Sequence, residues 1–265
     1  RLMHGTNVAL HVLSGLLITW LVLRLSGSGV IAWVALTMFL LHPITAEAVN
    51  YAAGRGDLLV TAFVLGACAL TLTPLWGFAP WALGLGLLSK ESAIVAGPLM
   101  LLLVAVRHSW KTWHLSLSLL ANTLLIGMFC YLVADARSMV PTQEFLFAQA
   151  AALSHALWLV VNPLSQVVEY PYGAVSFIWQ MLSVIVLTLL GAVGWLLRRT
   201  YPLLAFGVLW VLLSALPRLL IQPQANGGYL TLHHFYFQFP GIVMMLVGVA
   251  RPGGIPSQLC EERMT

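Results

Sequence analysis

Long apolar runs separated by short polar connections limit what this chain can fold into more than any other feature. Hydrophobic residues make up 60% of the 265 residues and charged residues only 8%, and the mean hydropathy is +0.94. A soluble domain does not need that much apolar surface, so the composition predicts a polytopic membrane protein. Backbone amides in hydrocarbon must be bonded within the protein, and these runs do not alternate as barrel strands do. We therefore expect an all-α transmembrane helical bundle.

The apolar runs predict about nine membrane spans. In chain order they cover residues 6–23, 29–41, 58–73, 75–88, 93–106, 113–134, 177–197, 202–220 and 235–250. Several of them are shorter than the ~20 residues that cross a bilayer untilted, so their ends are poorly defined by the sequence.

One further apolar helix, at 144–163, is expected to be re-entrant or interfacial. If it crossed, Arg198 and Arg199 would lie outside, against the positive-inside rule; a true tenth span stays open. No internal repeat is visible, so residues 1–250 are expected to form one membrane domain, and residues 251–265 a cytoplasmic tail.

The basic connections indicate the orientation. They share one face if the first span runs from outside to inside: Arg24, residues 107–111, Arg198, Arg199 and Arg251. The positive-inside rule makes this face cytoplasmic. The other face then holds the connection at 40–59, the SKES segment at 89–92, and the loops at 135–176 and 221–234. The net charge of +4 thus reflects topology and not nucleic-acid binding.

The connection LLHPITAEAVNYAAGRGDLL, at 40–59, concentrates ionisable groups at the edge of the apolar bundle. Such groups are costly there unless they are paired, wet or functional. Glu47 and Asp57 are candidate catalytic bases, because a carboxylate near apolar walls has a raised pKa. Arg55, between two glycines, suits phosphate or carboxylate binding, and His42 is a candidate substrate contact. The alternative is a solvated connection in which Arg55 and Asp57 pair or face water.

Lys90 is a lone lysine at a helix end on the non-cytoplasmic face, followed by Glu91. A cation on the side that the charge rule disfavours indicates an anionic headgroup or phosphate. An ion pair with Glu91 or with an acid of the 40–59 connection is the alternative. We take both residues as candidate substrate-binding groups.

Histidines stand near both ends of the chain. His4, Asn7 and His11 share one helical face; the pattern favours an interhelical polar clasp over a contact with sugar. In the last outer loop, adjacent histidines on a helix point apart, so His233 and His234 are not expected to bind a metal by themselves. Phosphate contact or a polar rim is the expected role there. No metal ligand is assigned.

With these motifs placed, the chain resembles a known family. HGTNVALH, LLHPITAEAVNYAAGRGDLL, LLSKESA, LVVNPLSQVVEYPYG and HHFYF occur in this order. Together they resemble the multispanning GT-C glycosyltransferases, most of all the transmembrane O-mannosyltransferases that modify cadherins and their bacterial relatives. The resemblance covers residues 4–249, and its specific parts are HP-x-x-x-E-A-V…GR-x-D-L-L and SKES.

The resemblance implies a GT-C-like fold and inverting transfer of a mannose-like sugar from a polyprenyl-phosphate carrier to a protein hydroxyl. The reaction would take place on the non-cytoplasmic face, in the bacterial inner membrane rather than the endoplasmic reticulum. Lys90 matches the family's lysine near the carrier phosphate, with Arg55 and His234 as further candidates and Tyr236 beside them. The donor is the one small molecule implied; divalent metal use is left open.

The family carries its catalytic acid on the first outer loop, after the first span. The chain starts at Arg1, within the segment that follows, so we expect that span and loop to be missing. This favours an alternative: a non-catalytic, truncated GT-C-like subunit that is a scaffold in a larger membrane complex. The retained Glu47, Arg55, Asp57 and Lys90 favour the enzyme. A transporter would need charged or broken helices at the membrane midplane, and ranks last.

Overall fold

The computed structural model describes residues 2–51, 54–106, 120–128, 143–166, 169–170, 176–220 and 230–250. The α-helices are α1 (Leu2–Ser26), α2 (Gly29–Leu41), α3 (Ala46–Asn50), α4 (Arg55–Thr71), α5 (Ala79–Ser89), α6 (Ala96–Val106), α8 (Gln143–Val161), α9 (Phe177–Leu197), α10 (Pro202–Leu220) and α11 (Phe239–Gly248). Residues 120–128 are also helical. The described chain is thus helical almost throughout, which confirms the all-α prediction.

Short turns and one strand pair connect these helices. The 3-10 turns are η1 (Pro43–Thr45), η3 (Trp76–Phe78), η4 (Glu91–Val95), η5 (Pro163–Ser165) and η6 (Leu232–Phe235). Strands β1 (Glu169–Tyr170) and β2 (Leu230–Thr231) pair antiparallel, with Glu169 opposite Thr231. This pair fixes Glu169 and Tyr170 beside the strand that leads directly into η6.

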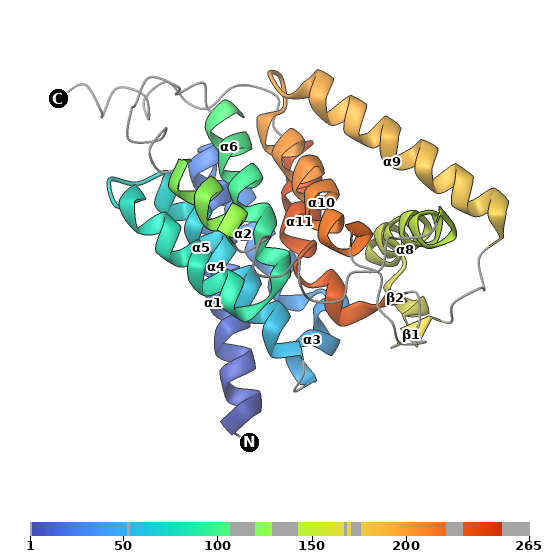
Figure 1. Cartoon of the computed structure of the whole chain (residues 1–265), viewed down its shortest axis with the longest axis horizontal. Helices are drawn as coiled ribbons and strands as arrows, with labels where there is room; N and C mark the ends of the chain where they lie inside the picture. The colour runs from blue at the N-terminus through green and yellow to red at the C-terminus, as the bar shows by residue number, and fades with distance from the viewer. Residues whose placement is uncertain are drawn as a thin grey trace.

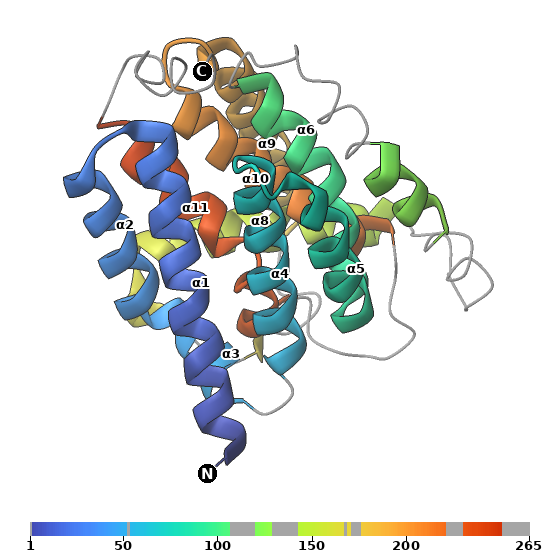
Figure 2. The ribbon, with the colours of Figure 1, turned by 90° about the vertical axis from the view of Figure 1, so that its left-hand side faces the viewer.

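The helices pack around one apolar core, to which both the N-terminal helices α1, α2, α4 and α5 and the C-terminal helices α10 and α11 contribute. Helix α1 packs against α2 and α4, α4 packs against α5, and α10 packs against α11 and α9. Helix α8 lies crosswise next to α9 and α10: it is seen end-on in Figure 1 and runs across the molecule in Figure 2.

The turn between α1 and α2 depends on two small residues. Gly27 has a φ of 64°, a backbone conformation that other residues rarely adopt. The side chain of Ser28 then caps α2 by accepting a hydrogen bond from the backbone N–H of Ile31. His42 and Pro43 end α2, because a proline disfavours the helical conformation of the residue before it.

Helices α10 and α11 approach so closely that only glycine fits between them. A Cβ on Gly207 would collide with the backbone N of Met245, and one on Gly248 with the backbone N of Leu204. Small residues allow helix backbones to meet in this way in membrane proteins. This contact fixes where η6, directly before α11, meets the rest of the bundle.

The number of helices that are long enough to cross a membrane is smaller than expected. Within the described residues, His4–Ser26 of α1 and all of α9 are long and apolar enough, and α2 with Pro43–Asn50, bent by 49°, would make a third. Helices α5 and α6 have 11 residues each. At ~1.5 Å per residue such a helix covers only about half of the ~30 Å hydrocarbon core.

The expected span ends agree with the structure in some places and differ in others. The bounds of α2, α9 and α10 agree with the expected ranges. Helix α4 begins at Arg55, so Arg55 and Asp57 lie in its first turn and not in a connection. An acidic side chain in a first turn interacts favourably with the helix dipole. Helix α5 begins later than expected, at Ala79, because η3 follows Pro74. Most of the expected 113–134 span lies outside the described residues.

Helix α9 lies at the margin of the molecule against α8 and α10 (Figure 1). Its outward side exposes large apolar residues along its whole length: Phe177, Ile178, Trp179, Leu182, Ile185, Val186, Leu189, Val193, Trp195 and Leu196. A continuous apolar face of this kind suits a lipid environment better than water.

The polar and basic segments lie at opposite ends of the bundle. The end of α2, α3, the start of α4 and η6 gather at the lower end in Figures 1 and 2. The end of α1, which carries Arg24, and the α9–α10 turn, which carries Arg198, lie at the upper end. Residues far apart in the sequence therefore meet at the lower end.

Candidate functional site

Lys90, Asp57 and His234 form the centre of the polar end. Lys90 follows α5 in an extended conformation, and its Nζ donates to Asp57 Oδ1 at 2.6 Å and to His234 Nδ1 at 3.2 Å. His234 Nδ1 lies 3.8 Å from Asp57 Oδ2. Asp57 is 3% exposed. The ion pair with an acid of the 40–59 connection, one of the two readings of Lys90, is therefore present.

A second carboxylate–histidine pair lies in the same part of the bundle. His233 Nδ1 is 2.8 Å from Glu47 Oε1, and both side chains are mostly buried. The other oxygen, Glu47 Oε2, is buried and has no hydrogen-bond partner within the described part of the chain. A buried carboxylate oxygen without a donor costs free energy, so this oxygen is well suited to accept a proton or a hydrogen bond from a bound molecule.

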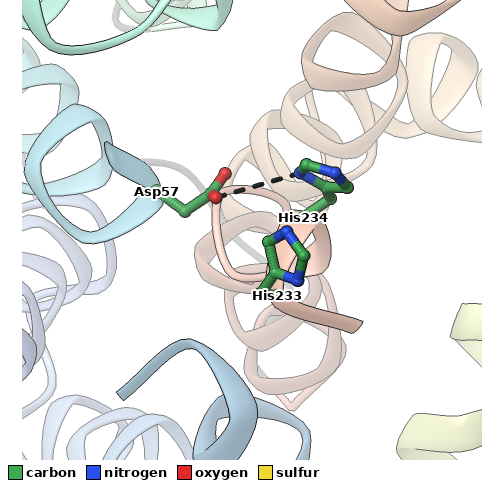
Figure 3. A group of neighbouring side chains, drawn as sticks. All are labelled: Asp57, His233 and His234. Atoms are coloured by element: carbon green, nitrogen blue, oxygen red, sulfur yellow. Dashed lines mark ion pairs between the residues drawn. The ribbon is translucent and has the colours of Figure 1, made fainter. Parts of the chain in front are cut away.

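The two histidine rings do not point apart, which corrects the sequence-based expectation. Their centroids are 4.1 Å apart, because each ring turns towards a carboxylate, His233 to Glu47 and His234 to Asp57. Figure 3 shows one ring nitrogen of His233 pointing towards Asp57 and His234. Asp57, His233 and His234 each offer a ligand atom, and these atoms all lie within 4.8 Å of one another.

Asp57 stays ionised at neutral pH. Burial raises the pKa of Asp57, but the ring of His234 and the charge and hydrogen bond of Lys90 together outweigh it and hold the pKa below its usual value. A carboxylate with a lowered pKa is a weak proton acceptor at neutral pH. Asp57 is therefore suited to hold Lys90 and His234 in place.

Close backbone contact joins the two helices that carry the carboxylates. A Cβ on Gly54, the residue before α4, would lie 2.5 Å from the backbone O of Ala48 in α3. Only glycine fits such an approach. Gly54 thereby sets the distance between Glu47 in α3 and Asp57 in α4.

Asn7 ties helix α1 to the same connection. Its Nδ2 donates to the backbone O of Val49 at 3.1 Å and of Tyr51 at 3.3 Å, and its Oδ1 accepts from Arg55 Nε at 3.3 Å. Asn7 is 1% exposed. This is the interhelical clasp that the sequence pattern favoured, and it positions the Arg55 side chain beside the connection.

Tyr236 lies in the core, not at the site surface as expected of a substrate-binding residue. Its side chain is fully buried, and its hydroxyl is 2.8 Å from His11 Nδ1. It packs edge-on against Phe39. The aromatic ring is stable in the apolar core, and His11 in α1 supplies the hydrogen bond that a buried tyrosine hydroxyl requires.

His42 is also used structurally. Its Nδ1 accepts from the backbone N–H of Ile44 at 3.2 Å, which caps η1, and its Nε2 lies 3.1 Å from the backbone O of Val160 in α8. Both ring nitrogens are therefore engaged, and neither is left to bind a substrate as the sequence suggested. Glu91 is exposed at the start of η4, next to Lys90 in the chain.

His233 is the site residue that the sequence-based list of candidates left out. The sequence predicts a phosphate contact or a polar rim for His233 and His234 together, and no metal site from them alone, because neighbouring side chains on a helix diverge. The available signal was the adjacent pair of histidines directly before the buried FYFQF segment. A polar ring that is largely buried requires a partner, and the two acids of the 40–59 connection were the available ones.

An apolar cavity of about 260 Å³ lies between α8, α9 and α10. Its lining is mostly aliphatic and includes Phe235, which follows His234 directly, and Gln238. Gln238 is 4% exposed, and its Oε1 has no hydrogen-bond partner among the described residues. The cavity is thus apolar, and one of its lining residues, Phe235, follows His234 of the polar cluster directly in sequence.

Comparisons of the chain with protein-family models, with curated proteins and with solved structures find no match.

Proposed function

We propose that this protein transfers a mannose-like sugar from a polyprenyl-phosphate carrier to a hydroxyl of a protein. One observation carries the proposal: the Lys90–Asp57–His234 group and the Glu47–His233 pair lie at one end of a strongly apolar helix bundle. A lipid-linked sugar places its headgroup at such an end while its tail stays in hydrocarbon. The order of sequence motifs, which resembles the GT-C O-mannosyltransferases, supports the same reaction.

Lys90 and His234 are the proposed contacts of the carrier phosphate, with Arg55 as a third. An ammonium group held by a buried carboxylate is positioned before the substrate arrives, so it stabilises developing negative charge without further rearrangement. Asp57 acts through Lys90 as a positioning residue, in keeping with its burial and lowered pKa.

Glu47 is the proposed general base. In the reaction the acceptor hydroxyl oxygen attacks the anomeric carbon of the sugar, and the hydroxyl proton passes to the Glu47 carboxylate. The bond between the anomeric carbon and the phosphate oxygen breaks, and that oxygen leaves with the electron pair as polyprenyl phosphate. Attack from the side opposite the leaving group inverts the anomeric configuration. The buried Oε2 of Glu47, which lacks a described partner, supports this assignment.

The cavity beside Phe235 is the proposed position of the first part of the carrier tail. Its walls are apolar, and apolar burial is the main source of affinity for a hydrocarbon chain. We further infer a multi-pass protein of the bacterial inner membrane, with the cluster on the non-cytoplasmic face. The position of Arg24 and Arg198 at the opposite end of the bundle supports that orientation.

The experiment that tests the proposal is a transfer assay. The full chain is reconstituted in liposomes with radiolabelled polyprenyl-phosphate mannose and a peptide that contains serine and threonine. We expect labelled peptide from the wild type and a loss of kcat of about 100-fold or more in Glu47→Gln, because a general base contributes roughly 10²–10⁴-fold. Arg24→Gln, which removes a cation at the opposite end of the bundle, is the matched control and retains turnover.

A folded wild-type protein that transfers no sugar would contradict this proposal. It would favour the alternative in which the chain is a non-catalytic scaffold subunit of a larger membrane complex. Its partners would then be membrane subunits instead of an acceptor protein, and co-purification from native membrane would identify them.

A further inference from the structure

Three metal-ligating side chains converge at the polar end from segments that are distant in sequence. The carboxylate of Asp57 comes from the first turn of α4, and the rings of His233 and His234 come from η6. Their ligand atoms lie within 4.8 Å of one another, and Figure 3 shows the three side chains turned towards a common point. One ion placed between such atoms can contact all three after small side-chain movements.

Glu47 completes the arrangement from outside the group. Its Oε1 lies 2.8 Å from His233 Nδ1, so the other nitrogen of this ring, Nε2, is the one directed towards Asp57 and His234 (Figure 3). A carboxylate on the far nitrogen of a metal-binding histidine fixes the ring orientation and increases its basicity. Glu47 and His233 therefore have the geometry of a supported ligand.

The ligand set identifies the class of ion. Two imidazole nitrogens and one carboxylate oxygen are the protein ligands of many catalytic zinc sites, which keep a fourth position open. Magnesium and calcium prefer oxygen ligands and would be bound weakly here.

Lys90 is the competitor for this position. Its Nζ contacts two of the three ligand residues, Asp57 and His234. An ammonium group and a divalent ion cannot occupy the same place, so a bound ion must displace it. The flexible stem of a lysine permits this movement, and Lys90 is partly exposed, so its ammonium group can turn to solvent or to an anion.

We propose that Asp57, His233 and His234 form a binding site for a divalent transition metal of the zinc class, which exchanges with the Lys90 ammonium group. Glu47 is a positioning residue for this site through His233. Binding of the ion releases Lys90 from Asp57. The site does not depend on the transfer reaction, because it is assayed without any donor or acceptor.

The test is a titration of the full chain, stripped with EDTA and held in detergent, with Co²⁺ as a spectroscopic probe. We expect saturable visible d–d absorption of low-coordinate Co²⁺ that Zn²⁺ abolishes by competition. His233→Gln and His234→Gln should each weaken binding at least about tenfold, and Glu47→Gln by about 10–100-fold. His4→Gln, at an exposed histidine outside the group, is the matched control and should leave the affinity unchanged.

Lys90→Met is the decisive variant, because competition predicts a gain of affinity of about tenfold or more, which misfolding cannot produce. Absence of saturable Co²⁺ absorption in the wild type would overturn the proposal. Equal binding by His233→Gln and the wild type, or no gain in Lys90→Met, would overturn it too. None of these outcomes bears on whether sugar transfer occurs, so failure here is distinguishable from failure of the proposed function.

Discussion

Lys90 Nζ lies 2.6 Å from Asp57 Oδ1 and joins the end of α5 to the first turn of α4. Asp57 is almost fully buried, and Lys90 is mostly buried. Removal of one partner of a buried pair leaves the other charge without compensation, which costs roughly 3–5 kcal/mol. The ion pair therefore makes the site and the packing of α4 against α5 depend on one another.

The first prediction concerns this dependence. Lys90→Met should lower the free energy of unfolding by about 3 kcal/mol, because it leaves the Asp57 carboxylate buried and unpaired. The double variant Asp57→Asn/Lys90→Met should be more stable than the single one, since neither charge remains. Denaturant unfolding in detergent with EDTA measures both. A single variant as stable as the double variant would show that the pair contributes little.

The second prediction concerns pH. The folded-state pKa of Asp57 lies below the unfolded-state value of ~3.9. Its ionised form therefore stabilises the fold fully above that value, and the contribution is lost as the pH falls through the folded-state pKa. The stability difference between the wild type and Asp57→Asn should be constant above about pH 5 and shrink below about pH 4. Unfolding curves across this range, with EDTA present, measure it; a difference that grows on acidification would contradict the sign.

The third prediction concerns Gly54. Gly54→Ala places a Cβ against the backbone O of Ala48, so α3 and α4 must move apart, at a cost of about 1–3 kcal/mol. Transfer should fall as well, because Glu47 and Asp57 no longer keep their spacing. Gly66→Ala, inside α4 with open space around it, is the matched control. It should raise stability by about 0.5–1 kcal/mol, as alanine favours a helix.

Suppose instead that Gly66→Ala loses as much stability as Gly54→Ala. The close approach of Gly54 to Ala48 would then not be the cause of the loss in Gly54→Ala. Thermal unfolding of both variants beside the wild type separates these outcomes.

Local patterns predicted the helices whose ends are marked in the sequence. Helix α2 stops at His42 before Pro43, and α9 and α10 meet at the Arg198 turn. The apolar run alone does not show that α4 begins at Arg55, although Asp57 is an acidic residue of the kind that stabilises a first helical turn. Within the described residues two or three helices are long and apolar enough to cross a membrane. Hydropathy counts apolar runs and does not show where turns shorten the helices.

The sequence predicted the charged residues of the candidate site, and an ion pair of Lys90 with an acid of the 40–59 connection was one of its two readings. Lys90, Asp57 and Glu47 stood out because charge is rare in this chain. The histidine contacts were not predicted, because the contact between His233 and Glu47 spans 186 positions, and no local pattern encodes such a distance. Tyr236 is the opposite case: the sequence placed it among the substrate-binding candidates beside His234, but its ring is fully buried in the core.

The most direct test of the central claim is the donor dependence of sugar transfer in Lys90→Met. We expect a fall in kcat/KM for polyprenyl-phosphate mannose of about 100-fold, because a positioned cation that stabilises the leaving phosphate is removed, while Arg24→Gln stays near the wild type. Unchanged turnover in folded Lys90→Met protein would contradict the proposed function, since the cation at the centre of the cluster would then have no part in the reaction.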